Sequence, residues 1–153
     1  RTGLALTDEV HLASCAGLLR SAPLSRATKG PPMAERTAAV VWRTLRAINR
    51  PIMLWNVFPL HPHGTGDAMS NRCHSRVERE ACQPFLIRLL EALAPKTVIA
   101  VGRDAEAALT QLGIASTTVR HPSYGGQPEF LEGLANHYGL PLDSAPVQGR
   151  LSL

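Results

Sequence analysis

The chain has 153 residues, enough for one domain; 44% are hydrophobic and 18% charged, which excludes a disordered or fibrous protein. Lys and Arg number 16 against 12 Asp and Glu, and this net charge of +4 is compatible with nucleic acid but is shared by many proteins that bind none. No apolar run approaches the roughly 20 residues that span a bilayer, and the first residues do not have the pattern of a signal peptide.

The amino-terminal part of the chain predicts two helices joined by a loop. Residues 7–19 indicate the first helix, because the hydroxyl of Thr7 can act as the N-cap and two acids follow it. Residues 21–32 are rich in Pro, Gly, Ser and Thr and predict the loop. We expect Pro32 to open the second helix, whose apolar residues recur at helical spacing as far as Ile48.

The middle of the chain predicts a strand, a long loop and a long helix. Residues 52–58 form a short apolar run of the kind found in buried parallel strands. Residues 59–74 lack periodicity and predict a loop, and loops of this length are usually functional. A Ser-x-x-Glu capping box at residues 75–78 begins a helix that runs to about residue 93, with Pro84 perturbing it.

The last third of the chain predicts two strands, each followed by a helix. Residues 97–101 are the clearest strand, closed by Gly102 and followed by a short helix. Residues 114–120 predict a strand that leads into His121, and residues 128–138 predict the final helix.

Strands separated by crossover helices predict an α/β fold with a parallel central sheet in a three-layer α/β/α sandwich. We expect residues 1–139 to form one domain and residues 140–153 an irregular tail. Ligands of such sheets bind beyond the carboxyl ends of the strands, here residues 56–59, 102–103 and 121–122.

Polar residues at these strand ends could carry chemistry. The amide of Asn56 offers a donor and an acceptor that could read the O4 and N3–H edge of a pyrimidine, or could bond its own loop. Pro122 restricts His121 to extended geometry, which suits a donor to a developing anion but also an ordinary surface turn. The following residues 124–126, Tyr-Gly-Gly, allow either close approach of a ligand or a tight turn.

A metal site is a second hypothesis, because one loop holds four side chains able to bind zinc: His61, His63, Cys73 and His74. Their spacing is not a common structural zinc pattern, so loop packing and phosphate contacts are the competing interpretation. The other cysteines, Cys15 and Cys82, form no CxxC pair, which argues against a disulfide scaffold and favours a reducing cytoplasmic setting. Neither a dinucleotide-binding glycine fingerprint nor a Walker phosphate loop occurs, although Arg103 begins a helix where phosphates often bind.

Several segments resemble, in order and spacing, the uracil-DNA glycosylase superfamily, and its iron–sulfur bacterial and archaeal branch in particular. These segments are residues 54–59 (Leu-Trp-Asn-Val-Phe-Pro), 71–72 (Asn-Arg), 80–86 (Glu-Ala-Cys-Gln-Pro-Phe-Leu), 94–103 and 120–123 (Arg-His-Pro-Ser). The resemblance extends from about residue 3 to about residue 134. It implies a domain of base excision repair that hydrolyses the N-glycosidic bond of uracil, or of a related deaminated base, in DNA.

The resemblance also implies roles for individual residues. Asn56 would recognise uracil, and His121 would donate a hydrogen bond to the uracil O2 as the glycosidic bond breaks. The loop of residues 122–127 would press into the minor groove while the base is flipped out. We expect further contacts to the base from Phe58, Leu6 and Ser123, and to the DNA from Pro122, Tyr124, Gly125, Gly126, Arg72 and Arg103.

The sequence departs from the family pattern at three places. A first strand and a motif that positions water would lie upstream of Arg1, so we expect a fragment or a processed product whose neighbouring strands are left exposed. Leu6 stands where an aromatic would stack on uracil. Cys82 matches a cluster ligand, but Leu60 replaces another, so we expect no iron–sulfur cluster and no cofactor.

These departures leave three functions open. The first is an enzyme of the bacterial cytosol or nucleoid, acting as a monomer, whose hydrolysis lacks an evident water-activating carboxylate. Asp8 and Glu9 are the acids nearest in sequence to the missing motif, but they fit better as acids of a first helical turn. The second is a non-catalytic DNA-binding module of the same fold, and the third is a zinc-dependent hydrolase built on the histidine loop.

Overall fold

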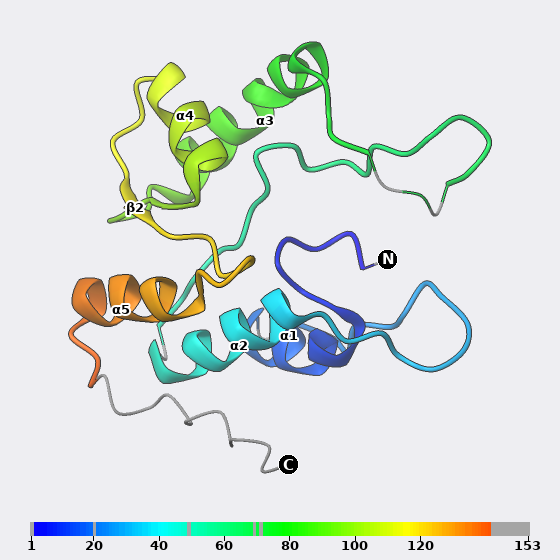
Figure 1. Ribbon diagram of the computed structural model, residues 1–153, viewed down its shortest axis with the longest axis horizontal. Coiled ribbons are helices and arrows are strands. Elements are labelled where there is room, and N and C mark those ends of the chain that lie inside the picture. The colour runs from blue at the N-terminus through cyan, green and yellow to red at the C-terminus, as the bar shows by residue number, and fades with distance from the viewer. Residues whose placement is uncertain (1, 20, 49, 69, 71, 142–153) are drawn as a thin grey trace.

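The computed structural model describes residues 2–19, 21–48, 50–68, 70 and 72–141 (Figure 1). Its elements, in chain order, are η1 (Glu9–His11), α1 (Leu12–Leu19), α2 (Arg36–Ile48), α3 (Arg76–Leu93), β1 (Ile99–Val101), α4 (Arg103–Gln111), β2 (Thr117–Val119) and α5 (Gln127–Tyr138). Figure 1 shows α3 and α4 on one side of the strands and α1, α2 and α5 on the other. The expected α/β architecture with a parallel sheet is therefore confirmed. None of the described helices is long and apolar enough to cross a membrane.

The sheet of the described residues consists of β1 and β2, which pair in parallel with Ile99 opposite Thr117 and Val101 opposite Val119. The backbone N–H of Gly102 continues the ladder by donating to the carbonyl of Val119 at 2.9 Å. The expected strand over residues 52–58 is wrong, because these residues form no strand in the structure. A strand requires a neighbour that takes up its backbone hydrogen bonds, and this segment has no such neighbour among the described residues.

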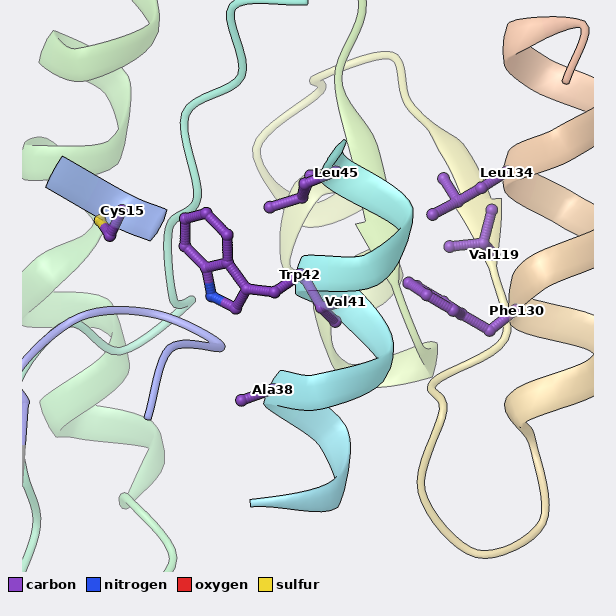
Figure 2. Close-up of a cluster of buried hydrophobic side chains, with 8 residues drawn as sticks. All are labelled: Cys15, Ala38, Val41, Trp42, Leu45, Val119, Phe130 and Leu134. Atoms are coloured by element: carbon purple, nitrogen blue, oxygen red, sulfur yellow. The ribbon is translucent and has the colours of Figure 1, made fainter. Parts of the chain in front are cut away.

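The hydrophobic core lies between α2, α5 and β2, with one side chain added by α1. Trp42 of α2 and Phe130 of α5 are each only 2% exposed, and Val119 of β2 belongs to the same cluster. Figure 2 shows the side chains of this cluster, which are Cys15, Ala38, Val41, Trp42, Leu45, Val119, Phe130 and Leu134. The core therefore anchors β2 immediately before the histidine that follows it.

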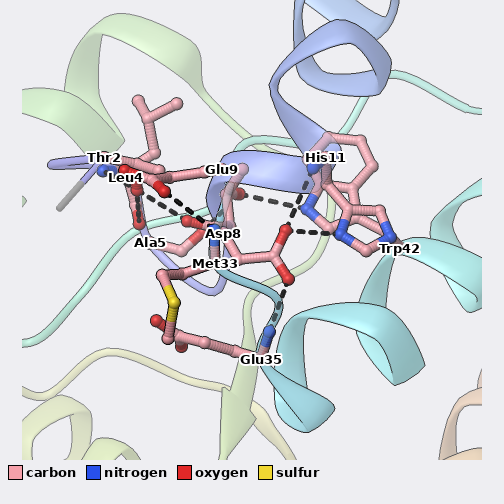
Figure 3. Close-up of polar contacts among 10 residues, drawn as sticks. Thr2, Leu4, Ala5, Asp8, Glu9, His11, Met33, Glu35 and Trp42 are labelled. Atoms are coloured by element: carbon pink, nitrogen blue, oxygen red, sulfur yellow. Dashed lines mark hydrogen bonds and ion pairs between the residues drawn. The ribbon is translucent and has the colours of Figure 1, made fainter. Parts of the chain in front are cut away.

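The amino terminus is organised by Asp8, whose side chain is only 1% exposed (Figure 3). Asp8 is the N-cap of η1 and accepts hydrogen bonds from the backbone N–H of His11 at 3.0 Å and from its Nδ1 at 2.6 Å. The expected N-cap, Thr7, instead accepts a hydrogen bond from Nε1 of Trp42 at 3.1 Å. The capping position is thus one residue later than expected, because the Thr7 hydroxyl is used by the core.

The second helix also begins later than expected, at Arg36 and not at Pro32. The backbone N–H of Glu35 donates to Asp8 at 2.7 Å, and that of Met33 donates to Glu9 at 2.8 Å (Figure 3). These contacts join residues 24 and 27 positions apart, so the carboxylates of the first turn determine where the loop ends and α2 starts.

The later helices follow the local signals in the sequence. Ser75 and Glu78 form both hydrogen bonds of the expected capping box, and α3 continues through Pro84 to Leu93. Gly139 ends α5 in the left-handed conformation with φ +66°. Most of the expected tail over residues 140–153 lies outside the described residues, which end at residue 141.

Candidate active site

A cavity of about 900 Å³ opens at the carboxyl ends of β1 and β2. Its walls come from Leu6, from residues 55–57, from Val101 and the first turn of α4, and from the end of β2 with the turn after it. The lining residues are Leu6, Trp55, Asn56, Val57, Val101, Gly102, Arg103, Asp104, Ala105, Glu106, Thr118, Val119, Arg120, His121 and Ser123. Five of the sequence-predicted site residues thus line one cavity: Leu6, Asn56, Arg103, His121 and Ser123.

His121 is half-buried at the cavity wall, and Ser123 fixes its ring. The backbone N–H of Ser123 donates to Nδ1 at 3.2 Å, and the Ser123 hydroxyl lies 2.7 Å from the same nitrogen. A backbone N–H can only donate, so Nδ1 must be the acceptor. The proton of the neutral imidazole therefore resides on Nε2, which is the nitrogen left to donate to a ligand.

The surroundings of His121 favour its neutral form. Burial lowers the pKa of His121, the positive charge of Arg120 lowers it further, and the negative charge of Asp104 opposes these effects. The net pKa lies below the ordinary value of 6.5. At neutral pH the ring is therefore an uncharged donor.

Two glycines make room for this histidine. Gly102 has φ +87°, and a Cβ at this position would lie 3.0 Å from the Cβ of His121. A Cβ on Gly126 would overlap the carbonyl oxygen of His121 and would lie 2.8 Å from Cγ of Arg120. Larger residues at either position would displace the histidine, so both glycines are required by close packing.

The first turn of α4 adds an electrostatic feature to the cavity. Gly102 is its N-cap and supplies no side-chain acceptor, so the first amides of α4 lack a side-chain cap. The positive end of a helix dipole stabilises negative charge nearby. Residues 103–106 line the cavity, and the acids Asp104 and Glu106 of this turn complement the positive end of the dipole.

The turn after His121 projects a single aromatic side chain into solvent. The backbone N–H of Gly126 donates to the carbonyl of Ser123 at 3.0 Å, which closes a four-residue turn. Both central residues have positive φ, Tyr124 at +49° and Gly125 at +79°. Such a conformation is strained for tyrosine, and its side chain is 99% exposed. Pro122, by contrast, is buried.

Two expected site residues lie elsewhere. The ring of Phe58 stacks on that of His74 with centroids 5.3 Å apart and does not line the cavity. The guanidinium of Arg72 bonds both carboxylate oxygens of Glu78, at 2.9 and 2.6 Å. Its charge is therefore compensated within the protein.

The histidine loop does not assemble a metal site among the described residues. The rings of His61 and His63 are 6.0 Å apart, and His74 is engaged with Phe58. No group of three His, Cys, Asp or Glu side chains able to hold an ion occurs in the described part of the chain.

Sequence reasoning missed two chemically important lining residues, Trp55 and Asp104. Trp55 directly precedes Asn56, and its position beside a candidate recognition residue was the available signal. Asp104 stands at the start of α4, where an acid is also expected simply to complement the helix dipole. The sequence around Asp104 therefore gives no sign that this residue lines the cavity.

Comparison with known proteins identifies the family. Residues 18–136 match the model of the uracil DNA glycosylase superfamily. No curated protein and no solved structure matched the chain. The matched segment contains both strands, Asn56 and His121, and covers well over half of the chain. The chain therefore belongs to the uracil DNA glycosylase superfamily.

Proposed function

We propose that this domain hydrolyses the N-glycosidic bond of uracil, or of a related deaminated base, in DNA. The proposal rests on one observation: Asn56 and His121 line the same cavity. The Ser123 N–H occupies Nδ1 of the histidine and leaves Nε2 to donate. The amide of Asn56 can bond both O4 and N3–H of uracil, and Nε2–H of His121 is free to reach O2.

The histidine would act on the leaving group. As the bond between C1′ of the sugar and N1 of the base breaks, the electron pair stays with the base and negative charge spreads onto O2. A preorganised donor stabilises charge that exists only as the bond breaks, and loss of one such donor costs roughly 10²–10³ in kcat. The uncharged state of His121 is suited to this role, because the ring can stabilise the anion without first being protonated.

The attacking water must form a bond to C1′ and release a proton. Two carboxylates line the cavity, and that of Glu106 accepts a hydrogen bond from the hydroxyl of Thr118 at 2.9 Å. Among the described residues, the carboxylate of Asp104 makes no hydrogen bond or ion pair, and its charge acts on His121. We therefore assign Asp104 as the acceptor of this proton.

DNA would be held by the rim of the cavity. Tyr124 is the exposed tip of the turn after His121 and is suited to enter the base stack as the target base leaves it. Arg103 and the net charge of +4 would contribute salt-dependent phosphate contacts. We expect the protein to act as a monomer.

The test is excision from an end-labelled oligonucleotide that carries one uracil, with abasic sites detected by alkaline strand cleavage. His121→Ala should slow excision about a hundredfold or more. Asp104→Asn should also slow it, whereas Glu132→Gln, on the exposed face of α5, serves as the matched surface control. Fluorescence anisotropy would measure binding in parallel.

Absence of abasic sites together with unchanged binding by His121→Ala would overturn the proposal. Preferential binding of uracil-containing DNA without cleavage would instead favour the non-catalytic DNA-binding module.

A further inference from the structure

We propose that α2 carries a second DNA-binding surface, an arginine stripe that binds phosphates of DNA outside the cavity. The stripe consists of Arg36, Arg43 and Arg46, and none of these three residues lines the cavity. The inference rests on the proposed function, which supplies DNA as the partner. It deepens that function, because a domain that finds a rare base in DNA first binds the undamaged DNA around it.

Helical spacing places the three arginines on one face of α2. Arg36 and Arg43 are seven residues apart, and Arg46 follows three residues later, so the three positions lie close together around the helix axis. Val41 and Trp42 of α2 belong to the hydrophobic cluster and mark a different face of the helix (Figure 2). Arg36 and Arg46 are exposed, and Arg43 is half-buried. The stripe is therefore the solvent side of an amphipathic helix.

The positive charges of the stripe are not balanced within the described part of the chain. Exposed helix faces often mix both signs, as α3 does where Nε of Arg76 bonds the carboxylate of Glu80 at 2.7 Å. Helix α2 contains no acidic residue, and no arginine of the stripe forms an ion pair with a described residue. Like charges on one helix face repel each other, so the stability of the helix does not account for the stripe.

The helix dipole explains only one end of the stripe. Arg46 lies in the last turn of α2, where a cation complements the dipole, whereas Arg36 is the first residue, where a cation opposes it. Between them, Nη2 of Arg43 is buried and has no hydrogen-bond partner among the described residues. An anion bound at the stripe would offset the unfavourable charge of Arg36 and would bring acceptors to the guanidinium of Arg43.

The length of the stripe fits a row of phosphates. Arg36 and Arg46 are ten residues apart, which corresponds to roughly 15 Å along the helix axis. Phosphates of one DNA strand follow each other every ~3.4 Å along the duplex axis, so the stripe spans about four or five of them. Arg50 adds a further positive charge beyond the end of α2, with its guanidinium carbon 6.0 Å from the ring centroid of Tyr138. Guanidinium groups bind phosphate oxygens through paired hydrogen bonds, which favours the DNA backbone as the partner.

The test compares two double variants that lower the net charge equally. Arg36→Gln/Arg46→Gln removes two charges of the stripe from exposed positions, where glutamine preserves the helix. Arg88→Gln/Lys96→Gln removes two exposed charges from α3 and from the segment that follows it, and α3 lies on the other side of the strands from α2 (Figure 1). Fluorescence anisotropy measures binding of each full chain to an undamaged DNA duplex at several salt concentrations, and circular dichroism verifies that each variant is folded.

Loss of the stripe should change both the affinity and its salt dependence. Arg36→Gln/Arg46→Gln should weaken binding of the undamaged duplex about tenfold and should lower the slope of log K against log salt concentration by about 1–2. The control double variant should bind within about twofold of wild type, because its charges lie outside the stripe. Arg36→Lys/Arg46→Lys should keep the wild-type slope, since lysine retains the charge. Excision from a uracil oligonucleotide too short to extend beyond the cavity should be unchanged in all three variants.

Three results would overturn the inference. The first is wild-type affinity and slope in Arg36→Gln/Arg46→Gln, and the second is an equal loss in the control double variant, because net charge alone then explains the effect. The third is binding of poly-glutamate that depends on the stripe while DNA binding does not, which assigns the stripe to an acidic protein. Failure of the proposed function is distinct from these results. A wild-type chain that excises no uracil but binds undamaged DNA through the stripe loses the glycosylase activity and keeps the second surface.

Discussion

Replacement of Asp8 by alanine should be among the most destabilising single substitutions in the amino-terminal region. The carboxylate is buried and receives three hydrogen bonds, two from His11 and one from the backbone N–H of Glu35 at the start of α2. Loss of the N-cap costs about 1 kcal/mol, and a buried N–H left without its acceptor costs roughly 1–3 kcal/mol more. We therefore expect Asp8→Ala to lower the free energy of unfolding by about 2–4 kcal/mol.

Thermal denaturation followed by circular dichroism measures this loss. For a domain of this size, such a change corresponds to a drop in Tm of roughly 5–15 °C. Glu132→Ala removes an exposed carboxylate from α5 and is the control, with an expected effect within about 0.5 kcal/mol. If Asp8→Ala unfolds at the temperature of the control, the three hydrogen bonds do not stabilise the fold and the reasoning fails.

The same carboxylate should make stability depend on pH. Burial raises the pKa of Asp8, but hydrogen bonds from Glu35 and His11 outweigh this effect, so the pKa lies below its ordinary value of 3.8. The unfolded chain then binds a proton more readily than the folded one, and the stabilisation is lost as the pH falls below 3.8 and through the folded pKa. Denaturant unfolding between about pH 5 and pH 3 covers the ordinary aspartate pKa of roughly 4. Over this range Asp8→Asn should lose less stability than wild type.

Three further outcomes are expected. Gly102→Ala should destabilise the protein by about 1–3 kcal/mol, because alanine is strained at positive φ and its Cβ would press against the side chain of His121. Unfolding curves measure the destabilisation, and excision assays measure the displacement of His121. Ser75→Ala should cost about 1 kcal/mol through loss of the α3 cap, and an unchanged Tm would contradict the capping geometry. In NMR titrations, Arg120→Gln should raise the pKa of His121 and Asp104→Asn should lower it, and shifts of the opposite sign would refute the charge arrangement.

The candidate site was only partly predictable from the sequence. His121 and Asn56 could be identified because they follow apolar segments in a motif order that resembles a family, and both line the cavity. Trp55 and Asp104 could not, because an apolar residue in a presumed strand and an acid in a first helical turn have sufficient local explanations. Arg72 was expected at DNA, but only the folded chain shows that Glu78 compensates its charge.

The sequence by itself determined those parts of the fold whose hydrogen bonds close within a few residues. The capping box of α3 and the glycine that ends α5 depend on contacts within one helical turn, so they can be read directly from neighbouring residues. Only the tertiary structure decided where α2 begins, since the amides of Met33 and Glu35 just before it are bound by acids 24 and 27 residues earlier. It also decided that residues 52–58 form no strand, because pairing depends on a neighbouring backbone and not on the apolar run itself.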